Sequence, residues 1–520
     1  MNRLILFEDE HLLVVNKPSG VNTHKPDRFA PDGIHEWLTK RQPRWRNLSI
    51  LHRLDKDTSG VLVLGKTPRA NQSLTKQFEQ HTLEKTYLLL SAARPTRMKF
   101  WAKSPNAATE FEFVQPHGDH FLVQARPFTG KTHQIRRHAA DNGFPILGDA
   151  QYGGEAAPRL MLHAHQIAFE HPGSGQRVSF EASVPRAFDE IDALVAALEF
   201  RELLFGDETN AFRLISGAAD DFHDVIVDSY AGMLLVQWQT EGAADNWRGL
   251  IERLREEGRP RAIYEQIVTK QKRTMPALVF EGHVPSSPME QVQQPRSRQG
   301  EVALPDRFPI REQGLTFLVN FNEGLSTGVF LDQRENRRRL LTMPLQGKAL
   351  LNTFAYTCTF SVAAAKAGAV TTSVDLSRNY LEWGQDNFRA NGLDPAAHEF
   401  VVGDAFEWLK RFGKRGRSWE VVILDPPTFS TTKQGRAFQA ARDYEDLATL
   451  AMPLVAPGGW LLCSTNQRTL EAEEFEKRIK DAVRRSGRAT QSLDFETLPF
   501  DFRVAPKEQP YLKTFWARLA

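Results

Sequence analysis

The chain has 520 residues, more than the ~250 to 300 at which a single hydrophobic core stops growing, so two or three domains are expected. With 41% hydrophobic and 25% charged residues and a mean hydropathy of −0.43, the composition is that of a soluble globular protein and excludes a largely disordered one. The net charge of +2 conceals a basic front part, residues 1–150, whose 22 Lys and Arg against 15 Asp and Glu favour an anionic partner such as nucleic acid.

The first twenty residues, MNRLILFEDEHLLVVNKPSG, place acidic residues where a signal peptide has its apolar core. No run approaches the ~18 apolar residues of a membrane span. We therefore expect a cytoplasmic protein with no membrane association. The two cysteines, Cys358 and Cys463, provide neither a disulfide framework nor metal-ligand spacing, so no metal site is expected.

Three domains are predicted along the chain. Short β-branched and aromatic runs such as HLLVV, GVLVLG and TYLLL recur between turn residues up to about residue 190, which predicts a β-rich mixed domain over residues 1–195. A helical pattern and a second αβ segment follow, which predicts a small αβ domain over 196–300 that includes a Pro-, Ser- and Gln-rich linker at 281–308. Beyond it, apolar strands alternate with helices to the end of the chain. We expect a doubly wound, Rossmann-like parallel sheet over 301–520, and therefore a multi-domain fold of the α/β and α+β classes.

The front domain carries four motifs in order. They are HRLDKDTSG at 52–60, EKTYLLL at 84–90, GKTHQIRRH at 130–138 and LGDAQYGG at 147–154. An aspartate in a polar turn, as Asp55 is, often only binds its own backbone. The ordered set, however, resembles the RluA family of pseudouridine synthases, and NKPSG at 16–20 fits the family's opening strand.

This resemblance implies a site that converts uridine to pseudouridine without metal or cofactor. Asp55 is then the catalytic aspartate, Tyr87 packs against the target ring, and Arg136 pairs with Asp55 and keeps it ionised. Breaking the glycosidic bond calls for a carboxylate at the anomeric region, as nucleophile or as base, and the sequence does not choose between them. Lys131 stands where the family usually has Arg. The basic, aromatic run RQPRWRNLSI at 41–50 is either an RNA contact or a solvated face.

The rear domain has the spacing of a nucleotide site. A strand, loop and helix at about 350–370 are followed some twenty residues on by Asp375 at the end of the next strand. VVILDPPTFS at 421–430 resembles the [DN]PP[FY]-type motif of S-adenosylmethionine (SAM)-dependent methyltransferases. TGVFLDQR at 327–334 resembles an element of the large-subunit rRNA methyltransferases of the RlmI and RlmK type.

That second resemblance implies the following positions. The residues expected around the SAM cofactor are Phe330, Asp332, Arg334, Phe354, Tyr356, Thr357, Asp375 and Asp404. Those expected to hold the target base are Asp425, Pro426, Pro427, Phe429 and Asn466. Cys358 stands where the family typically has Gly, and its side chain is expected to narrow the cofactor site. The arginine run RENRRR at 334–339 is either an RNA contact or an exposed helix face.

The atom that is methylated depends on a cysteine. Carbon-5 of cytosine is not nucleophilic until a thiolate adds to the ring, as in the RlmI type. Counting from Gly458 and Gly459, that position holds Thr465 and Asn466, while Cys463 falls inside the strand. Guanine nitrogen-7, as in the RlmK type, needs only positioning and is favoured. Cytosine carbon-5, another base nitrogen, and an RNA-binding scaffold with one or both sites inactive remain alternatives. The expected partner is RNA, in particular large-subunit rRNA, and the oligomeric state stays open.

Overall fold

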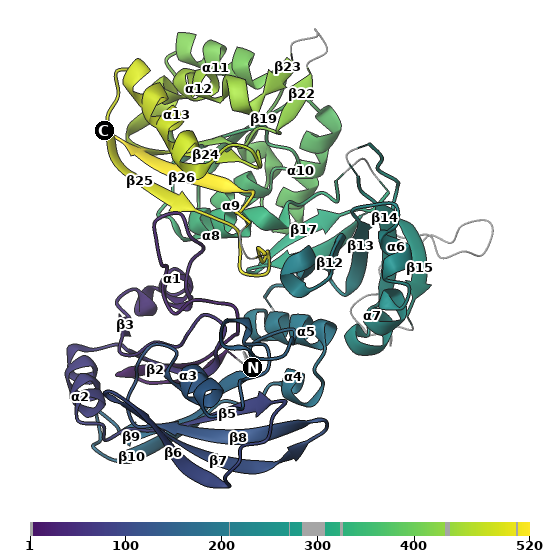
Figure 1. The fold of residues 1–520 in the computed structure, drawn as a ribbon. Coiled ribbons are helices and arrows are strands. Elements are labelled where there is room, and N and C mark those ends of the chain that lie inside the picture. The colour runs from purple at the N-terminus through teal and green to yellow at the C-terminus, as the bar shows by residue number, and fades with distance from the viewer. Residues whose placement is uncertain are drawn as a thin grey trace. The chain divides into compact units, whose positions relative to one another are not determined.

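A computed structural model describes residues 4–206, 208–269, 271–282, 307–322, 326–431, 437–505 and 508–520 (Figure 1). It divides into a front unit, Met1–Gly206 with Asp220–Phe222, and a rear unit, Asp207–Ala219 with His223–Ala520. The predicted linker lies almost wholly outside the described residues, and the division into three domains stays a prediction. In the described part of the chain, no helix is long and apolar enough to span a membrane.

The front unit is built on one mixed sheet of ten strands in the order β1-β2-β4-β9-β5-β8-β7-β6, with β3 beside β4 and β10 beside β9. Strands β4 and β9 run parallel, and the other described pairs are antiparallel. The strands are β1 (Ile5–Glu8), β2 (Leu12–Lys17), β3 (Ser49–Ile50), β4 (Ser59–Gly65), β5 (Glu84–Ser91), β6 (Lys99–Ser104), β7 (Ala107–His117), β8 (His120–Pro127), β9 (Leu162–Glu170) and β10 (Arg177–Glu181).

Five helices belong to this unit: α1 (Ile34–Thr39), α2 (Pro68–Glu79), α3 (Gln134–Asp141), α4 (Arg186–Asp189) and α5 (Ala193–Leu204). Helix α2 shows why the sequence folds this way. Thr67 caps it by accepting a 3.3 Å hydrogen bond from the amide of Ala70, and Pro68 occupies the first turn, where its missing N–H costs nothing. Ala70 and Leu74, one turn apart, are buried against the sheet.

The rear unit begins with a five-stranded sheet, β11 to β15 in chain order, and a two-stranded one, β16 with β17. These strands share one apolar core with the part that follows, in which Tyr230 and Leu235 belong to the same buried cluster as Phe317, Leu340 and Trp516. The elements are β11 (Ala211–Ser216), β12 (Val225–Tyr230), β13 (Met233–Trp238), α6 (Ala243–Asn246), α7 (Leu250–Gly258), β14 (Ala262–Ile267), β15 (Ala277–Glu281), β16 (Phe308–Glu312) and β17 (Leu315–Val319).

A seven-stranded sheet completes the rear unit, in the order β20-β19-β18-β21-β24-β26-β25. Its first five strands are parallel, whereas β26 is antiparallel to both of its neighbours. The strands are β18 (Ala349–Thr353), β19 (Val370–Asp375), β20 (Glu399–Val402), β21 (Trp419–Leu424), β24 (Val455–Thr465), β25 (Thr490–Glu496) and β26 (Lys513–Leu519). A separate short hairpin pairs β22 (Phe429–Thr431) with β23 (Ala437–Gln439).

Helices cover both sides of this sheet (Figure 1). One group, in which α9 contacts α8 and α10, comprises α8 (Arg334–Thr342), α9 (Thr359–Lys366) and α10 (Arg378–Ala390). The other, in which α12 contacts α11 and α13, comprises α11 (Ala405–Lys414), α12 (Ala440–Ala451) and α13 (Ala472–Arg485). The predicted fold class is confirmed. The strand order reverses at β18, so a ligand crevice is expected at the carboxyl ends of β18 and β21.

Candidate active sites

In the front unit, Asp55 lies on the loop between β3 and β4. Its Oδ2 atom is 3.8 Å from Nη1 of Arg136 and 4.0 Å from Nε2 of His133. Tyr87 lies on β5, where burial and then the negative charge of Asp55 raise the pKa of its hydroxyl. The structure therefore brings together the three predicted residues, from a loop, a strand and a helix.

Arg136 has a different main partner from the predicted one. Its Nε and Nη2 atoms each donate a 2.7 Å hydrogen bond to the buried carboxylate of Asp149, and its guanidinium lies 5.0 Å from the ring centre of Tyr152. Burial lowers the pKa of Arg136, but the bonds to Asp149 outweigh it and raise that pKa. The predicted pair of Arg136 with Asp55 is present, at 3.8 Å through Nη1, and Asp149 is a second and closer partner that holds the guanidinium.

The loop that carries Asp55 is fixed by the segment after β2. The buried ammonium of Lys17 donates to the carbonyls of Pro18, Val21 and Lys56 at 2.9, 2.7 and 3.0 Å. An ammonium has three N–H donors, so these three acceptors satisfy it fully. The amide of Gly20 also donates to the Lys56 carbonyl, at 2.9 Å. The motif NKPSG thus acts as a clamp on the loop that presents the aspartate.

The cofactor loop of the rear unit, residues 354–358, joins β18 to α9. Phe354, Tyr356 and Cys358 adopt left-handed backbone conformations with φ of 56°, 49° and 61°, a conformation that non-glycine residues rarely adopt and that clusters at functional sites. Asp375, at the end of β19, holds the loop by accepting a 2.9 Å hydrogen bond from the amide of Tyr356. Thr357 anchors its far side, donating from its hydroxyl to the carbonyl of Gly328.

These residues fit the adenosine part of SAM. Asp375 accepts one backbone hydrogen bond on each carboxylate oxygen, from Tyr356 and Ser377, which leaves each oxygen a second acceptor position for a ribose hydroxyl. Phe330 is 48% exposed and its ring packs on Tyr356 with centroids 5.4 Å apart. Asp404, at the end of the next strand, caps α11 by accepting a 3.0 Å hydrogen bond from the amide of Glu407.

Cys358 does not fill the cofactor side of its loop. Its thiol is buried and packs against Gly384 of α10, so closely that a Cβ atom on Gly384 would lie 2.5 Å from Sγ. The expected narrowing of the cofactor site is therefore corrected: the glycine on α10 provides the room that the cysteine takes.

Arg334 is not placed to bind a cofactor. Its buried guanidinium donates to the carboxylate of Asp501 at 2.7 Å and to the carbonyl of Ala211 at 2.9 Å, inside the core of the rear unit. The rest of the arginine run is also occupied. Arg337 donates two hydrogen bonds of 2.6 and 2.8 Å to Glu312, and Arg339 pairs with Asp494 at 2.7 Å. Neither an exposed helix face nor an RNA contact describes this run, because its charges are neutralised within the protein.

The predicted base site lies at the end of β21. Asp425 accepts a 3.1 Å hydrogen bond from Nε2 of Gln333, Pro426 is buried and Pro427 exposed, and the side chain of Phe429 lies outside the described part. Burial, together with the nearby charge of Asp332, raises the pKa of Asp425 to about 7.

Two further predicted residues border Asp425. Asp332, predicted near the cofactor, is held by the hydroxyl of Tyr511 at 2.9 Å, and its charge acts on Asp425. Asn466 follows β24, and its side-chain oxygen accepts a hydrogen bond from the hydroxyl of Thr428, two residues after the DP pair. Asp425 and Asn466 thus follow the ends of the neighbouring parallel strands β21 and β24, and Asp332 comes from the short 3-10 helix Leu331–Gln333.

A buried polar chain that the sequence did not reveal supports Asp425. The side-chain amide nitrogen of Gln333 donates to Ser464 at 2.8 Å as well as to Asp425, and its side-chain oxygen Oε1 accepts a 2.7 Å hydrogen bond from Asn336. Asn336 in turn accepts a 2.8 Å hydrogen bond from the indole of Trp516. In the sequence, Gln333 is marked only by its place inside the TGVFLDQR element, between Asp332 and Arg334. With every amide group of Gln333 occupied, the direction of the Asp425 carboxylate is fixed.

Known families and proteins resemble both parts of this chain. A family model described as RNA pseudouridylate synthase matches residues 11–141, and one described as S-adenosylmethionine-dependent methyltransferase matches residues 299–491. The Bacillus subtilis protein named putative ribosomal RNA large subunit methyltransferase YwbD is 36% identical over 330 residues, 62% of this chain and 78% of that protein. This chain belongs to the ribosomal RNA large-subunit methyltransferase family.

Other relatives of this methyltransferase match different extents of it. Ribosomal RNA large subunit methyltransferase I of Shewanella amazonensis is 31% identical over 328 residues, 61% of this chain and 77% of that protein. Methyltransferase K/L of Syntrophotalea carbinolica is 40% identical over 204 residues, 39% of this chain and 27% of that protein. The crystal structure of SMU.776, a putative methyltransferase complexed with SAH, covers 68% of this chain and 87% of its own, with 26% identity and a TM-score of 0.54. The methyltransferase is thus an enzyme that combines a pseudouridine synthase domain with a domain that uses SAM.

Proposed function

We propose that this methyltransferase modifies large-subunit rRNA in two ways, converting uridine to pseudouridine at Asp55 and methylating guanine at nitrogen-7 beside Asp425. The proposed sites use the residues predicted from the sequence, except that Arg334 is left out, Asp332 is assigned to the base and Asp149 is added. Relatives named as ribosomal RNA large-subunit methyltransferases, together with the basic front part of the chain, support rRNA as the substrate.

In the front site, Asp55 supplies the carboxylate that acts at the anomeric region of the flipped uridine, as nucleophile or as base. Arg136, oriented by Asp149, presents a positive nitrogen 3.8 Å from that carboxylate and helps to hold it in position. Tyr87 offers an aromatic surface to the base. The clamp around Lys17 keeps the loop in place before RNA arrives, which lowers the cost of ordering it on binding.

In the rear site, one observation carries the choice of nitrogen-7: neither cysteine is placed to attack a base. Cys463 is fully buried in β24, where its neighbours across the sheet are Leu424 and Phe515, and burial raises the pKa of its thiol to about 12. Burial raises the pKa of Cys358 to about 12 as well. Methylation of cytosine carbon-5 requires a thiolate that adds to the ring, and both thiols are enclosed and neutral.

The remaining groups suit a base that becomes positively charged. SAM supplies an electrophilic methyl group on its sulfonium. Guanine nitrogen-7 has an in-plane lone pair and no proton to lose, so no general base is needed, and its methylation leaves a positive charge on the ring. The carboxylates of Asp425 and Asp332 stabilise that charge, while Thr428 and Asn466 offer hydrogen-bonding groups at the edge of the site.

The proposal is tested by comparing the nucleosides of large-subunit rRNA after reaction with the wild type, Asp55→Asn and Asp425→Ala. We expect pseudouridine and 7-methylguanosine with the wild type, loss of pseudouridine alone with Asp55→Asn, and loss of 7-methylguanosine alone with Asp425→Ala, with SAM still bound. Pseudouridine formed equally well by Asp55→Asn would refute the front assignment. 5-Methylcytosine in place of 7-methylguanosine would restore the carbon-5 alternative.

A further inference from the structure

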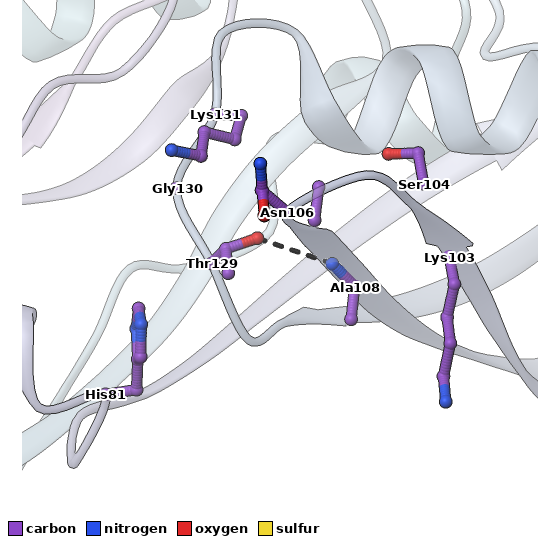
Figure 2. A pocket seen from close by; sticks show the side chains of 9 residues that line it. His81, Lys103, Ser104, Asn106, Ala108, Thr129, Gly130 and Lys131 are labelled. Carbon is purple, nitrogen blue, oxygen red and sulfur yellow. Dashed lines mark hydrogen bonds between the residues drawn. The ribbon is translucent and has the colours of Figure 1, made fainter.

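The front unit has a second feature apart from the site around Asp55. An open groove of about 600 Å³ runs between the loop after β8, residues 129–131, and the turn that joins β6 to β7 (Figure 2). It is lined by His81, Lys103, Ser104, Asn106, Ala107, Ala108, Thr129, Gly130 and Lys131. We propose that this groove, named here the β6–β8 groove, binds the sugar-phosphate backbone of the single RNA strand next to the uridine that Asp55 acts on.

The charge of the groove matches a polyanion. Its lining contains two lysines and one histidine, and no acidic residue. Lys103 and Lys131 make no salt bridge within the described parts of the chain, whereas Lys99 and Arg126 nearby are paired with Glu110 and Glu112. Cations left without a carboxylate partner bind phosphates at the smallest electrostatic cost, because no existing ion pair has to be broken.

The arrangement of these charges suits an extended ligand. Figure 2 shows His81, Lys103 and Lys131 at separate edges of the groove, not converging on one point. A single small anion needs converging donors, whereas successive phosphates of a strand meet separated ones. Phe128, next to the groove, is 54% exposed, and its ring centroid lies 5.0 Å from that of His81. Exposed aromatic rings beside cations are typical of single-strand binding, because bases stack on the rings while phosphates meet the charges.

The walls of the groove are held in place by the helix that also serves the active site. Gln134 of α3 accepts hydrogen bonds from the Thr129 hydroxyl at 2.6 Å and the Lys131 amide at 3.1 Å, and it donates to the Ala108 carbonyl at 3.0 Å. His138, one turn on, is 2.9 Å from the hydroxyl of Ser104. The groove is therefore preformed, and binding does not have to order it.

The groove also lies close to the reacting carboxylate. His133, whose Nε2 atom is 4.0 Å from Asp55, is three positions beyond Gly130 in the groove wall, and three positions span at most about 11 Å. One RNA strand can therefore occupy the groove and place a flanking uridine at Asp55. This assignment rests on the proposed pseudouridine synthase activity and adds to it the path of the substrate.

Lys103→Ala and Phe128→Ala in the full-length protein test the groove, with Lys76→Ala as the matched control. Lys76 is an exposed lysine of α2 on the same unit and not in the groove. With an rRNA fragment that carries the target uridine, we expect Lys103→Ala to raise KM for pseudouridine formation about three- to tenfold with little change in kcat. The slope of log Kd against log salt should fall by about 0.7, the value for one phosphate contact on a single strand. Phe128→Ala should raise KM without changing that slope.

The outcomes separate this inference from the proposed function. If the wild type forms pseudouridine and both Lys103→Ala and Phe128→Ala keep its KM and salt slope, the groove assignment is wrong and the activity stands. If Lys76→Ala weakens binding as much as Lys103→Ala does, the effect is one of general charge, and the assignment is equally wrong. A wild type that forms no pseudouridine refutes the proposed function itself. Inhibition by 10 mM inorganic phosphate at constant ionic strength would identify a small-anion site and overturn the strand assignment.

Discussion

Arg136 is bound more tightly to Asp149 than to Asp55: two of its nitrogens lie 2.7 Å from the Asp149 carboxylate, and the third lies 3.8 Å from Asp55. Asp149 is almost fully buried, so its charge is available only to this guanidinium. Its position decides where the positive charge beside Asp55 sits, although Asp149 itself does not touch Asp55.

Asp149→Asn should therefore impair pseudouridine formation without removing any group that touches the substrate. The amide keeps the shape but loses the charge, so Arg136 is released to move onto Asp55, and a displacement of about 1 Å is enough to cost roughly 100-fold in rate. The measurement is the single-turnover rate at saturating RNA. Glu112→Gln, which loosens the exposed pair with Arg126, is the control and should be neutral. An unchanged rate in Asp149→Asn would show that Arg136 needs no orienting partner.

Gly384 and Cys358 should behave as one coupled pair. In the wild type, Gly384→Ala places a Cβ atom 2.5 Å from the buried Sγ of Cys358, which should cost about 1 to 3 kcal/mol of stability and weaken SAM binding through the loop. In a Cys358→Gly background the clash is gone, and alanine in a helix gains up to ~1 kcal/mol over glycine. A double-mutant cycle by thermal unfolding measures this reversal of sign. Additive effects would contradict the contact.

Cys463→Ser should retain methyl transfer, because the thiol lies inside β24 and away from the base. Any loss should come from packing and stay below ~2 kcal/mol of unfolding free energy. The measurements are the methylation rate and the denaturant midpoint. RNA containing 5-fluorocytosine, which traps enzymes that attack cytosine, should form no covalent complex with the wild type. A trapped complex, or one that Cys463→Ser abolishes, would reinstate the carbon-5 mechanism.

Asp425 should make both stability and methylation depend on pH. Its pKa of about 7 in the folded protein exceeds the 3.8 of an unperturbed carboxyl, so the folded state loses stability as pH rises from about 4 to 7. Asp425→Asn keeps an acceptor for Gln333 and removes the buried charge. It should therefore raise Tm at pH 8 by roughly 2 to 4 °C and have less effect at pH 5.

The methylation rate should change with pH in the opposite direction to the folding stability. Because the ionised carboxylate stabilises the cationic base, methylation by the wild type should rise through pH 7 and level off above it. Asp425→Asn should be slow at every pH, with a flat profile. A wild-type profile without an inflection between pH 6 and 8 would show that Asp425 does not titrate in the reaction.

The sequence predicted the features that can be recognised from motifs and elements in their order along the chain. The resemblance of four ordered motifs to a known family implied that Asp55, Tyr87 and Arg136 share one site, and the alternation of strands and helices predicted the doubly wound sheet. These succeed because a strand end or a helix turn fixes a side chain locally, and the fold then brings the strand ends together.

What failed depended on partners far away in sequence. Arg334 looked like a ligand-binding arginine because nothing near it in the chain showed that Asp501 would neutralise it. Asp149 lies in the motif LGDAQYGG, but nothing near it in the chain showed that it would bind Arg136, because that bond exists only after α3 has packed. Cys358 has room because Gly384 has no side chain, and no local sequence pattern predicts that these two residues pack together.

The buried guanidinium of Arg334 also limits how the rear half can be divided. It joins the carboxylate of Asp501, near the end of the chain, to the Ala211 carbonyl at the start of β11, and the apolar cluster around it draws on both sheets. A fragment that begins at residue 301 would lose Tyr230 and Leu235 from the buried cluster that also holds Leu340 and Phe317, and would leave the hydrogen bond from Arg334 to Ala211 unmade. A fragment from residue 301, which contains the seven-stranded sheet without β11 to β15, should aggregate when expressed. The smallest fragment of the rear unit expected to fold begins at residue 207.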